Sequence, residues 1–220
     1  MIRVTQQPEP TCFDSKVRQL GQSFLQNCPS PHGKEWRNHD YWQKVHKDLY
    51  KVYNGRCAYT GMWFSAVDRL SVDHFRPKSI CPDLAYEWSN YRLTTQKTNA
   101  YKANHDDIID PFSVQPEWFI LEIPTCLINV GNNVSISERT KIEHTINVLK
   151  LNDDNEYVES RKEIILSYIA GAISLNNMNE KYPFIACELQ RQNLTDISTL
   201  ETIFKTKSLQ IEEMINPAYY

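Results

Sequence analysis

Apolar residues recur at helical spacing at both ends of this 220-residue chain, but not in the segment between them. From Asp40 to Tyr53, for example, they return every three or four positions, which indicates an amphipathic helix. From Arg56 to Asn104 the pattern changes to short apolar stretches separated by turn-forming residues. This change predicts an α+β fold, with a small mixed module embedded in a mostly helical chain.

The same periodicity predicts the other elements. Helices are expected at 12–26, 40–53, 95–104, around the 142–149 stripe, from Asp153 or Asp154 to about Leu175, and from Leu200 to Pro217. Trp118–Ile123 and Leu127–Val130 are expected to be short strands, and Met62–Phe64 and Leu70–Val72 flank a polar turn that predicts a hairpin. These elements predict three regions, which are a helical segment 1–55, a mixed module 56–112 and a mostly helical region 113–220.

Charge divides the chain unevenly, although its formal net charge is only −3. Residues 1–105 hold 15 Lys and Arg against 9 Asp and Glu, a net of +6, whereas residues 106–220 hold 9 against 18, a net of −9. A basic half suits a polyanion, because Lys and Arg neutralise phosphates. The acidic half is expected to dock on a protein partner through residues 138–220, with an ordinary solvated acidic surface as the alternative.

Several classes of protein do not fit the sequence. No apolar run approaches the roughly 20 residues of a membrane-spanning helix, and the first residues lack the layout of a signal peptide. The six cysteines form no C-x-x-C pair, so a disulfide scaffold is not indicated. We therefore expect a cytoplasmic protein with reduced thiols and no membrane partner.

The residues with the clearest chemical meaning lie in the central module. Asp73 and His74 end a predicted strand, Asn90 follows His74 by 16 residues, and Asn99 lies nine residues beyond Asn90 in a predicted helix. Lys102 comes one helical turn after Asn99. A strand-borne His, a loop Asn and a helix-borne Asn in this order resemble the HNH (ββα-metal) endonuclease motif.

The resemblance implies a role for each residue. Asp73 and Asn99 would supply oxygen ligands to Mg²⁺, or to another divalent ion such as Mn²⁺, and oxygen ligands are those that Mg²⁺ prefers. His74 would take a proton from the attacking water, since histidine titrates near neutral pH. Asn90 would hold the loop that aims His74. Candidate phosphate contacts are Lys102, Arg76 and Lys78.

Each residue alone has a simpler interpretation. An Asp-His pair is often a turn or a surface pair, and Asn90 and Asn99 are also typical of a loop and a helix cap. The joint order and spacing favour a metal-dependent phosphodiesterase acting on DNA or RNA. The alternative is a non-catalytic HNH-like scaffold that binds a partner protein or nucleic acid without cutting it.

One part of the HNH pattern is missing. Many members carry two C-x-x-C pairs that bind a structural zinc, and the corresponding positions here are Cys57, Thr60, Thr95 and Thr98. Threonine does not replace a thiolate as a zinc ligand. A structural zinc is therefore not expected, and packing by Tyr59, Trp63 and Leu93 is expected to take over its role.

Further phrases resemble one branch of the HNH nucleases. They are Phe13–Gly21, Tyr41-Trp42, Cys57–Gly61, Val72–Ser79, Tyr86–Leu93, Ile109–Phe112 and the predicted helix Thr140–Asn152. They look like the HNH subunit, PtuB, of Septu-type and retron-linked anti-phage defence systems. That resemblance implies an ATPase partner of the PtuA type and, for a retron, a reverse transcriptase with its RNA–DNA hybrid.

Overall fold

The fold is mixed α+β and mostly helical, as predicted. The computed structural model describes residues 1–152 and 155–205. Its α-helices are α1 (Gln19–Asn27), α2 (His46–Val52), α3 (Gln96–Lys102), α4 (Ile136–Val148), α5 (Asn155–Ile169), α6 (Leu175–Lys181) and α7 (Pro183–Arg191). Its strands are β1 (Leu70–His74), β2 (Tyr91–Thr95), β3 (Phe119–Leu121) and β4 (Ile128–Val130). A π-helical turn, Asp14–Arg18, leads into α1, and short 3₁₀ turns cover Gly33–Trp36, Tyr41–Val45, Pro82–Leu84 and Trp88–Asn90.

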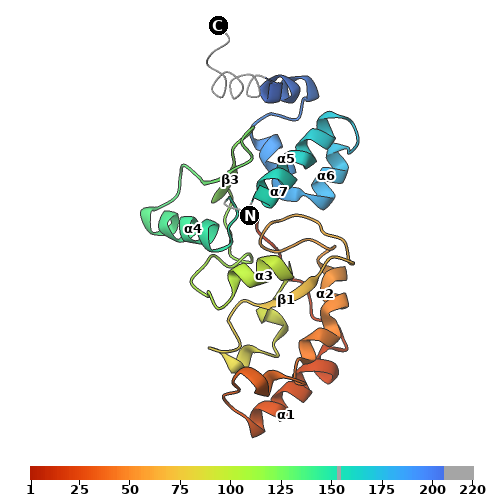
Figure 1. The fold of residues 1–220 in the computed structure, drawn as a ribbon, viewed down its shortest axis with the longest axis vertical. Coiled ribbons are helices and arrows are strands. Elements are labelled where there is room, and N and C mark those ends of the chain that lie inside the picture. The colour runs from red at the N-terminus through yellow and green to blue at the C-terminus, as the bar shows by residue number, and fades with distance from the viewer. Residues whose placement is uncertain (153–154, 206–220) are drawn as a thin grey trace.

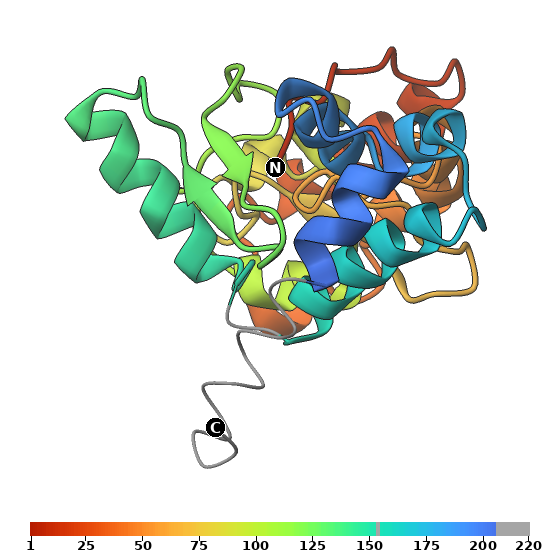
Figure 2. The ribbon, with the colours of Figure 1, turned by 90° about the horizontal axis from the view of Figure 1, so that it is seen from above.

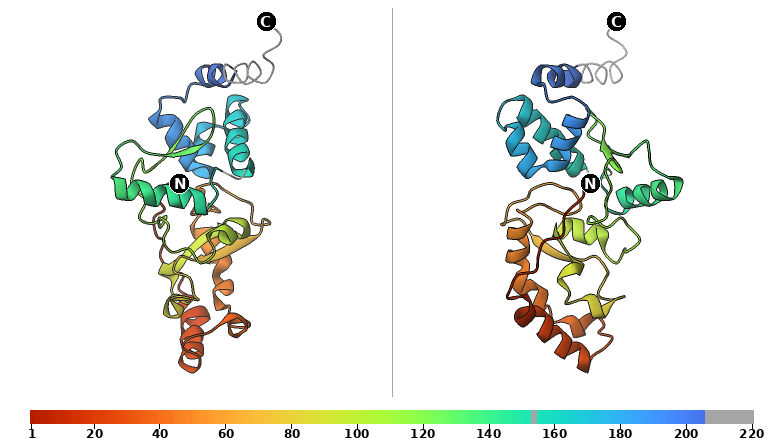
Figure 3. Two further views of the ribbon diagram at one scale, coloured as in Figure 1. Left: turned by 60° about the vertical axis from the view of Figure 1, so that its left-hand side comes forward. Right: turned by 180° about the vertical axis from the view of Figure 1, so that it is seen from behind.

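The elements follow one another along the long axis of the molecule. Helices α1 and α2 lie toward one end, β1 and α3 lie in the middle, and α5, α6 and α7 lie beyond them (Figure 1). Seen from above, α4 and the β3–β4 pair lie to one side of the C-terminal helices (Figure 2). The two views of Figure 3 show α4 reaching away from the rest of the chain.

The central sheet pairs different segments from those expected. Strand β1 runs antiparallel to β2, with Asp73 opposite Arg92 and His74 opposite Tyr91. The predicted hairpin of Met62–Phe64 with Leu70–Val72 is therefore wrong. The main-chain amide of Trp63 donates to the carbonyl of Lys181, so its hydrogen bond goes to the C-terminal region.

The second sheet agrees with the prediction. Strands β3 and β4 are antiparallel and lie within the two expected stretches. Helix α7 packs against this pair: buried Glu188 accepts a 2.8 Å hydrogen bond from the Leu121 amide, and Gln192 donates to the Leu121 carbonyl at 2.8 Å. In the described part of the chain no helix has both the length and the apolar character needed to cross a membrane.

The C-terminal helices divide differently from the prediction. Helix α5 ends at Ile169, short of Leu175, and Gly171 has a φ of 72°, which favours glycine at a helix end. Ser174 then caps α6, and α7 begins at Pro183, elements that the periodicity did not predict. The last expected helix is present at 197–205 and its remainder lies outside the described residues, as does the expected cap at Asp153 or Asp154.

Gly21 of α1 lies against the central module. A Cβ atom at this position would lie 2.0 Å from Cγ of Tyr86, whose ring is buried. We expect Gly21→Ala to lower the free energy of unfolding by about 1–3 kcal/mol or more, because overpacking displaces a buried ring. Urea denaturation measures this loss. Ser23→Ala, on an exposed position of the same helix, is the matched control, and equal midpoints for the two variants would contradict the prediction.

Candidate active site

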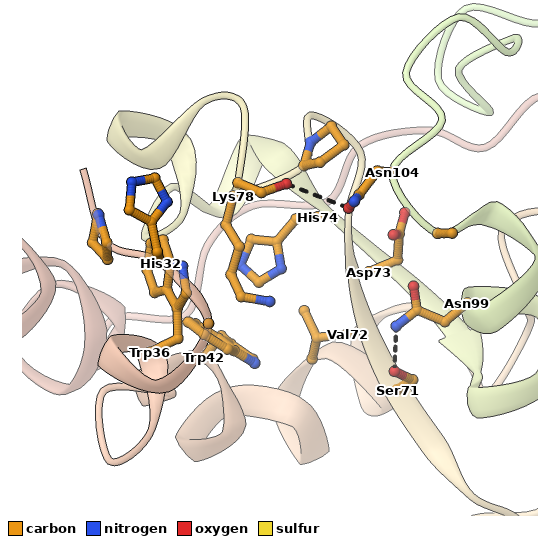
Figure 4. A pocket seen from close by; sticks show the side chains of 15 residues that line it. His32, Trp36, Trp42, Ser71, Val72, Asp73, His74, Lys78, Asn99 and Asn104 are labelled. Carbon is orange, nitrogen blue, oxygen red and sulfur yellow. Dashed lines mark hydrogen bonds between the residues drawn. The ribbon is translucent and has the colours of Figure 1, made fainter.

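Four of the residues singled out from the sequence, Asp73, His74, Lys78 and Asn99, line one surface cavity. Asp73 and His74 come from the end of β1, and Asn99 comes from α3, which follows β2 directly. The cavity has a volume of about 470 Å³. Figure 4 shows Asp73 and Asn99 side by side, with His74 and Lys78 next to them. The β1–β2–α3 unit therefore gathers a carboxylate, an imidazole and an amide that are 26 residues apart at most in the sequence.

The orientation of His74 follows from its hydrogen bond. Its Nε2 atom lies 2.9 Å from the carbonyl oxygen of Ala85, which can only accept, so Nε2 carries the proton. The neutral ring then has its lone pair on Nδ1. The indole of Trp42 packs edge-on against the ring at 4.7 Å. Burial, helped by the positive charge of Lys78, lowers the pKa of His74 to about 3, so the imidazole is neutral at physiological pH.

Asp73 is buried, and two polar side chains contact its carboxylate. Tyr59 donates a hydrogen bond to one carboxylate oxygen, and the Lys102 ammonium lies 3.3 Å from the other. Burial raises the pKa of Asp73 above its ordinary value, and the Lys102 charge opposes that rise. An additional cation at the cavity side would therefore stabilise the ionised carboxylate.

The structure corrects the role expected for Lys102. Its side chain is 0% exposed and its Nζ atom donates to the carbonyl oxygens of His74 and Phe75, both at 2.7 Å. A side chain enclosed in this way does not reach a phosphate. Lys102 instead stabilises the end of β1, because its ammonium contacts both the Asp73 carboxylate and the His74 carbonyl.

Asn99 presents its oxygen to the cavity. Its Nδ2 atom donates to the Ser71 hydroxyl at 2.8 Å. Figure 4 shows the amide oxygen on the side of Asp73. The carboxylate of Asp73 and the amide oxygen of Asn99 therefore form a pair of hard oxygen donors, and this donor set suits Mg²⁺ or Mn²⁺.

Asn90 does not line the cavity but holds the loop behind it. Its Oδ1 accepts from the Arg76 amide at 2.8 Å, and its Nδ2 donates to the carbonyls of Arg76 and Leu84, both at 3.0 Å. Leu84 precedes Ala85, whose carbonyl accepts from His74. The three bonds of Asn90 thus connect the two loops that fix the His74 ring.

The remaining two basic residues occupy different places. Lys78 lines the cavity and is partly buried, with its Nζ 5.3 Å from the centre of the Trp42 ring. Burial lowers the pKa of Lys78 below its ordinary value. Arg76 does not line the cavity; it is exposed and forms a 2.9 Å ion pair with Asp106. Of the three predicted basic residues, Lys78 is the one that lines the cavity.

Sequence reasoning missed the opposite wall of the cavity. This wall consists of Pro31, His32, Gly33, Trp36 and Trp42. Pro31, His32 and Gly33 have the composition of a turn, and Trp42 belongs to the apolar stripe of the predicted helix 40–53, so the local sequence had no signal for a site. Among these residues His32 is exposed and capable of hydrogen bonding or proton transfer.

Thr95 and Thr98, two of the positions compared above with zinc ligands, make hydrogen bonds of their own. The Thr95 hydroxyl accepts from the Thr98 amide at 3.3 Å and so caps α3, and the Thr98 hydroxyl lies 2.7 Å from that of Tyr157. The thiol of Cys57 lies 3.4 Å from the Thr94 hydroxyl. Thr95 and Thr98 are thus joined to each other and to α5 by side-chain contacts.

No family model matches the chain. A curated protein, the Septu protein PtuB from Bacillus thuringiensis, is 26% identical to it over 183 residues. The aligned part is 83% of this chain and 66% of that protein, so the chain spans just under two thirds of the relative's length. Over most of its own length this chain is similar to a Septu protein.

Proposed function

We propose that this chain is a metal-dependent HNH endonuclease that hydrolyses phosphodiester bonds of DNA or RNA. One observation carries the proposal: Asp73, His74 and Asn99 line the same cavity on a β1–β2–α3 unit. A scaffold has no need for a carboxylate, a neutral imidazole and an amide oxygen around one space. The similarity to a Septu protein supports a role in anti-phage defence, with an ATPase partner of the PtuA type.

The oxygens of Asp73 and Asn99 would hold the divalent ion. When bound, Mg²⁺ supplies a Lewis acid that stabilises the charge developing on the phosphate. His74 takes the proton of the attacking water on Nδ1, because Nε2 is already engaged with the Ala85 carbonyl. Lys78 binds a phosphate oxygen at the edge of the cavity.

Asn90 and Lys102 act behind the site. Asn90 fixes the loop whose Ala85 carbonyl orients His74, and Lys102 ties the Asp73 carboxylate to the backbone of His74. Neither side chain lines the cavity. Both are therefore positioning residues, which preserve the geometry on which the reaction depends.

The metal dependence is tested by Asn99→Ala in a digest of DNA and RNA with the ATPase partner present. We expect the Mg²⁺ concentration for half-maximal cutting to rise about tenfold or more, because one of two protein oxygens is lost. Cutting by the wild type should stop when EDTA removes the metal. Asn147→Ala, an exposed asparagine of α4 outside the cavity, is the matched control. Undiminished cutting in EDTA, or identical Mg²⁺ curves for both variants, would contradict the proposal.

A further inference from the structure

A second group of metal-ligating side chains lies outside the proposed active site. His105 and Asp107 follow α3, and His144 lies on α4. One donor atom from each residue lies within 4.8 Å of the other two. Asp107 is between the rings, with one oxygen 3.3 Å from Nδ1 of His105 and the other 2.8 Å from Nε2 of His144. None of the three lines the cavity of the proposed active site.

We propose that His105, Asp107 and His144 form a binding site for a divalent transition-metal ion of the Zn²⁺ class. Two imidazoles and a carboxylate are a ligand set that Zn²⁺ accepts, with a fourth position left for water. For metal–ligand bonds of about 2.0–2.1 Å, tetrahedral geometry places the donor atoms about 3.3–3.4 Å apart. The observed separations of 2.8 and 3.3 Å involve different oxygens of Asp107, and one donor atom from each residue lies within 4.8 Å of the other two. The side chains would therefore have to shift to bring all three donors to that spacing.

The surroundings of the His144 Nε2 atom are consistent with a metal ligand. Its Nε2 atom is shielded from solvent and makes no hydrogen bond of acceptable geometry to any described residue, although Asp107 Oδ2 lies 2.8 Å away. A buried polar atom without a hydrogen bond is costly. Coordination of a metal by the Nε2 lone pair would remove this cost.

The backbone around the three ligands is already held in place. The His105 amide donates to the Lys102 carbonyl at 2.9 Å in the turn that follows α3. The amide of buried Ile109 donates to the hydroxyl of Thr145, the residue after His144, at 2.8 Å. The backbone that carries the three ligands would therefore need little rearrangement, and a bound metal would connect α4 to the helix that carries Asn99 and Lys102.

Cobalt is a suitable probe, because its visible absorption reports the number and type of ligands. We expect the full-length wild type to bind Co²⁺ with the visible bands of a four-coordinate nitrogen and oxygen site and to release it to Zn²⁺. A thiolate charge-transfer band should be absent. His105→Ala and His144→Gln should each weaken this binding at least about tenfold, because each removes a ligand. Both side chains are partly exposed, so these variants are expected to fold, and circular dichroism checks this.

Two controls separate this site from other metal-binding groups of the chain. His46→Ala removes a histidine far from the cluster in sequence, and His74→Ala alters the proposed active site; both should retain the cobalt spectrum. Loss of the spectrum in His74→Ala alone would assign it to the active site and overturn the second site. A thiolate band, or unchanged binding in His144→Gln, would also overturn it. The wild-type unfolding midpoint should rise with Zn²⁺, and that of His144→Gln should not.

Discussion

His74→Ala is expected to lower the rate of nucleic-acid cleavage by about 10²–10⁴-fold, the usual contribution of a general base. The physical reason is the lone pair that the neutral ring carries on Nδ1. Nε2 is held by the Ala85 carbonyl, and the neutral ring leaves Nδ1 free to accept the proton of water. Alanine removes that acceptor but leaves the oxygens of Asp73 and Asn99 in place. Single-turnover cutting with the ATPase partner present measures the loss.

The matched control is His46→Ala, which removes a histidine that does not line the cavity. Its rate should equal that of the wild type. Because His74 also contacts Trp42, the unfolding midpoint of both variants must be measured alongside their activity. Equal cutting by His74→Ala and wild type would show that another group is the base. Absence of cutting by the wild type in the active complex would favour the non-catalytic scaffold.

Lys102→Met is expected to lower the free energy of unfolding by about 3–5 kcal/mol. The substitution keeps the length of the side chain but removes a fully buried ammonium. The Asp73 carboxylate then loses its cation, and the carbonyls of His74 and Phe75 lose their donor. Breaking one side of a buried ion pair is strongly destabilising, because the remaining charge stays buried without compensation. Urea denaturation of the full-length chain measures the change.

Lys47→Met is the control for this experiment, since Lys47 is exposed on α2. Its effect should stay within about 0.5 kcal/mol, as for most surface substitutions. A second variant, Lys102→Met combined with Asp73→Asn, should recover part of the stability, because the uncompensated charge is gone. A wild-type midpoint for Lys102→Met, or no recovery in the double variant, would show that the ammonium does not stabilise the site.

Local spacing predicted most of the elements well. The helix predicted between Asp40 and Tyr53 corresponds to a 3₁₀ turn followed by α2. The two short strands predicted after Trp118 correspond to β3 and β4. The central helix was also expected, and Thr95 caps it. These elements follow from the backbone periods of 3.6 and 2 residues, which any short stretch of sequence records.

The hairpin failed because strand pairing is a contact between distant segments. Leu70–His74 pairs with Tyr91–Thr95 across a long connection, and nothing in the local pattern distinguishes that partner from Met62–Phe64. The predicted phosphate contact of Lys102 was wrong for a similar reason. Lys102 lies one helical turn after Asn99, where the sequence alone suggests a solvated lysine. In the fold, α3 packs on β1 and this places the side chain in the interior.

By itself the sequence determined the fold class, most helices and the order of chemical groups, because residue type and spacing are local properties. It placed Asp73, His74, Asn90 and Asn99 in one motif. Only the tertiary structure decided which of them share a cavity, which wall faces them and which lysine is buried. It also brought His144 to His105 and Asp107, because α4 packs against the segment that follows α3 and so joins residues that are 37 positions apart or more.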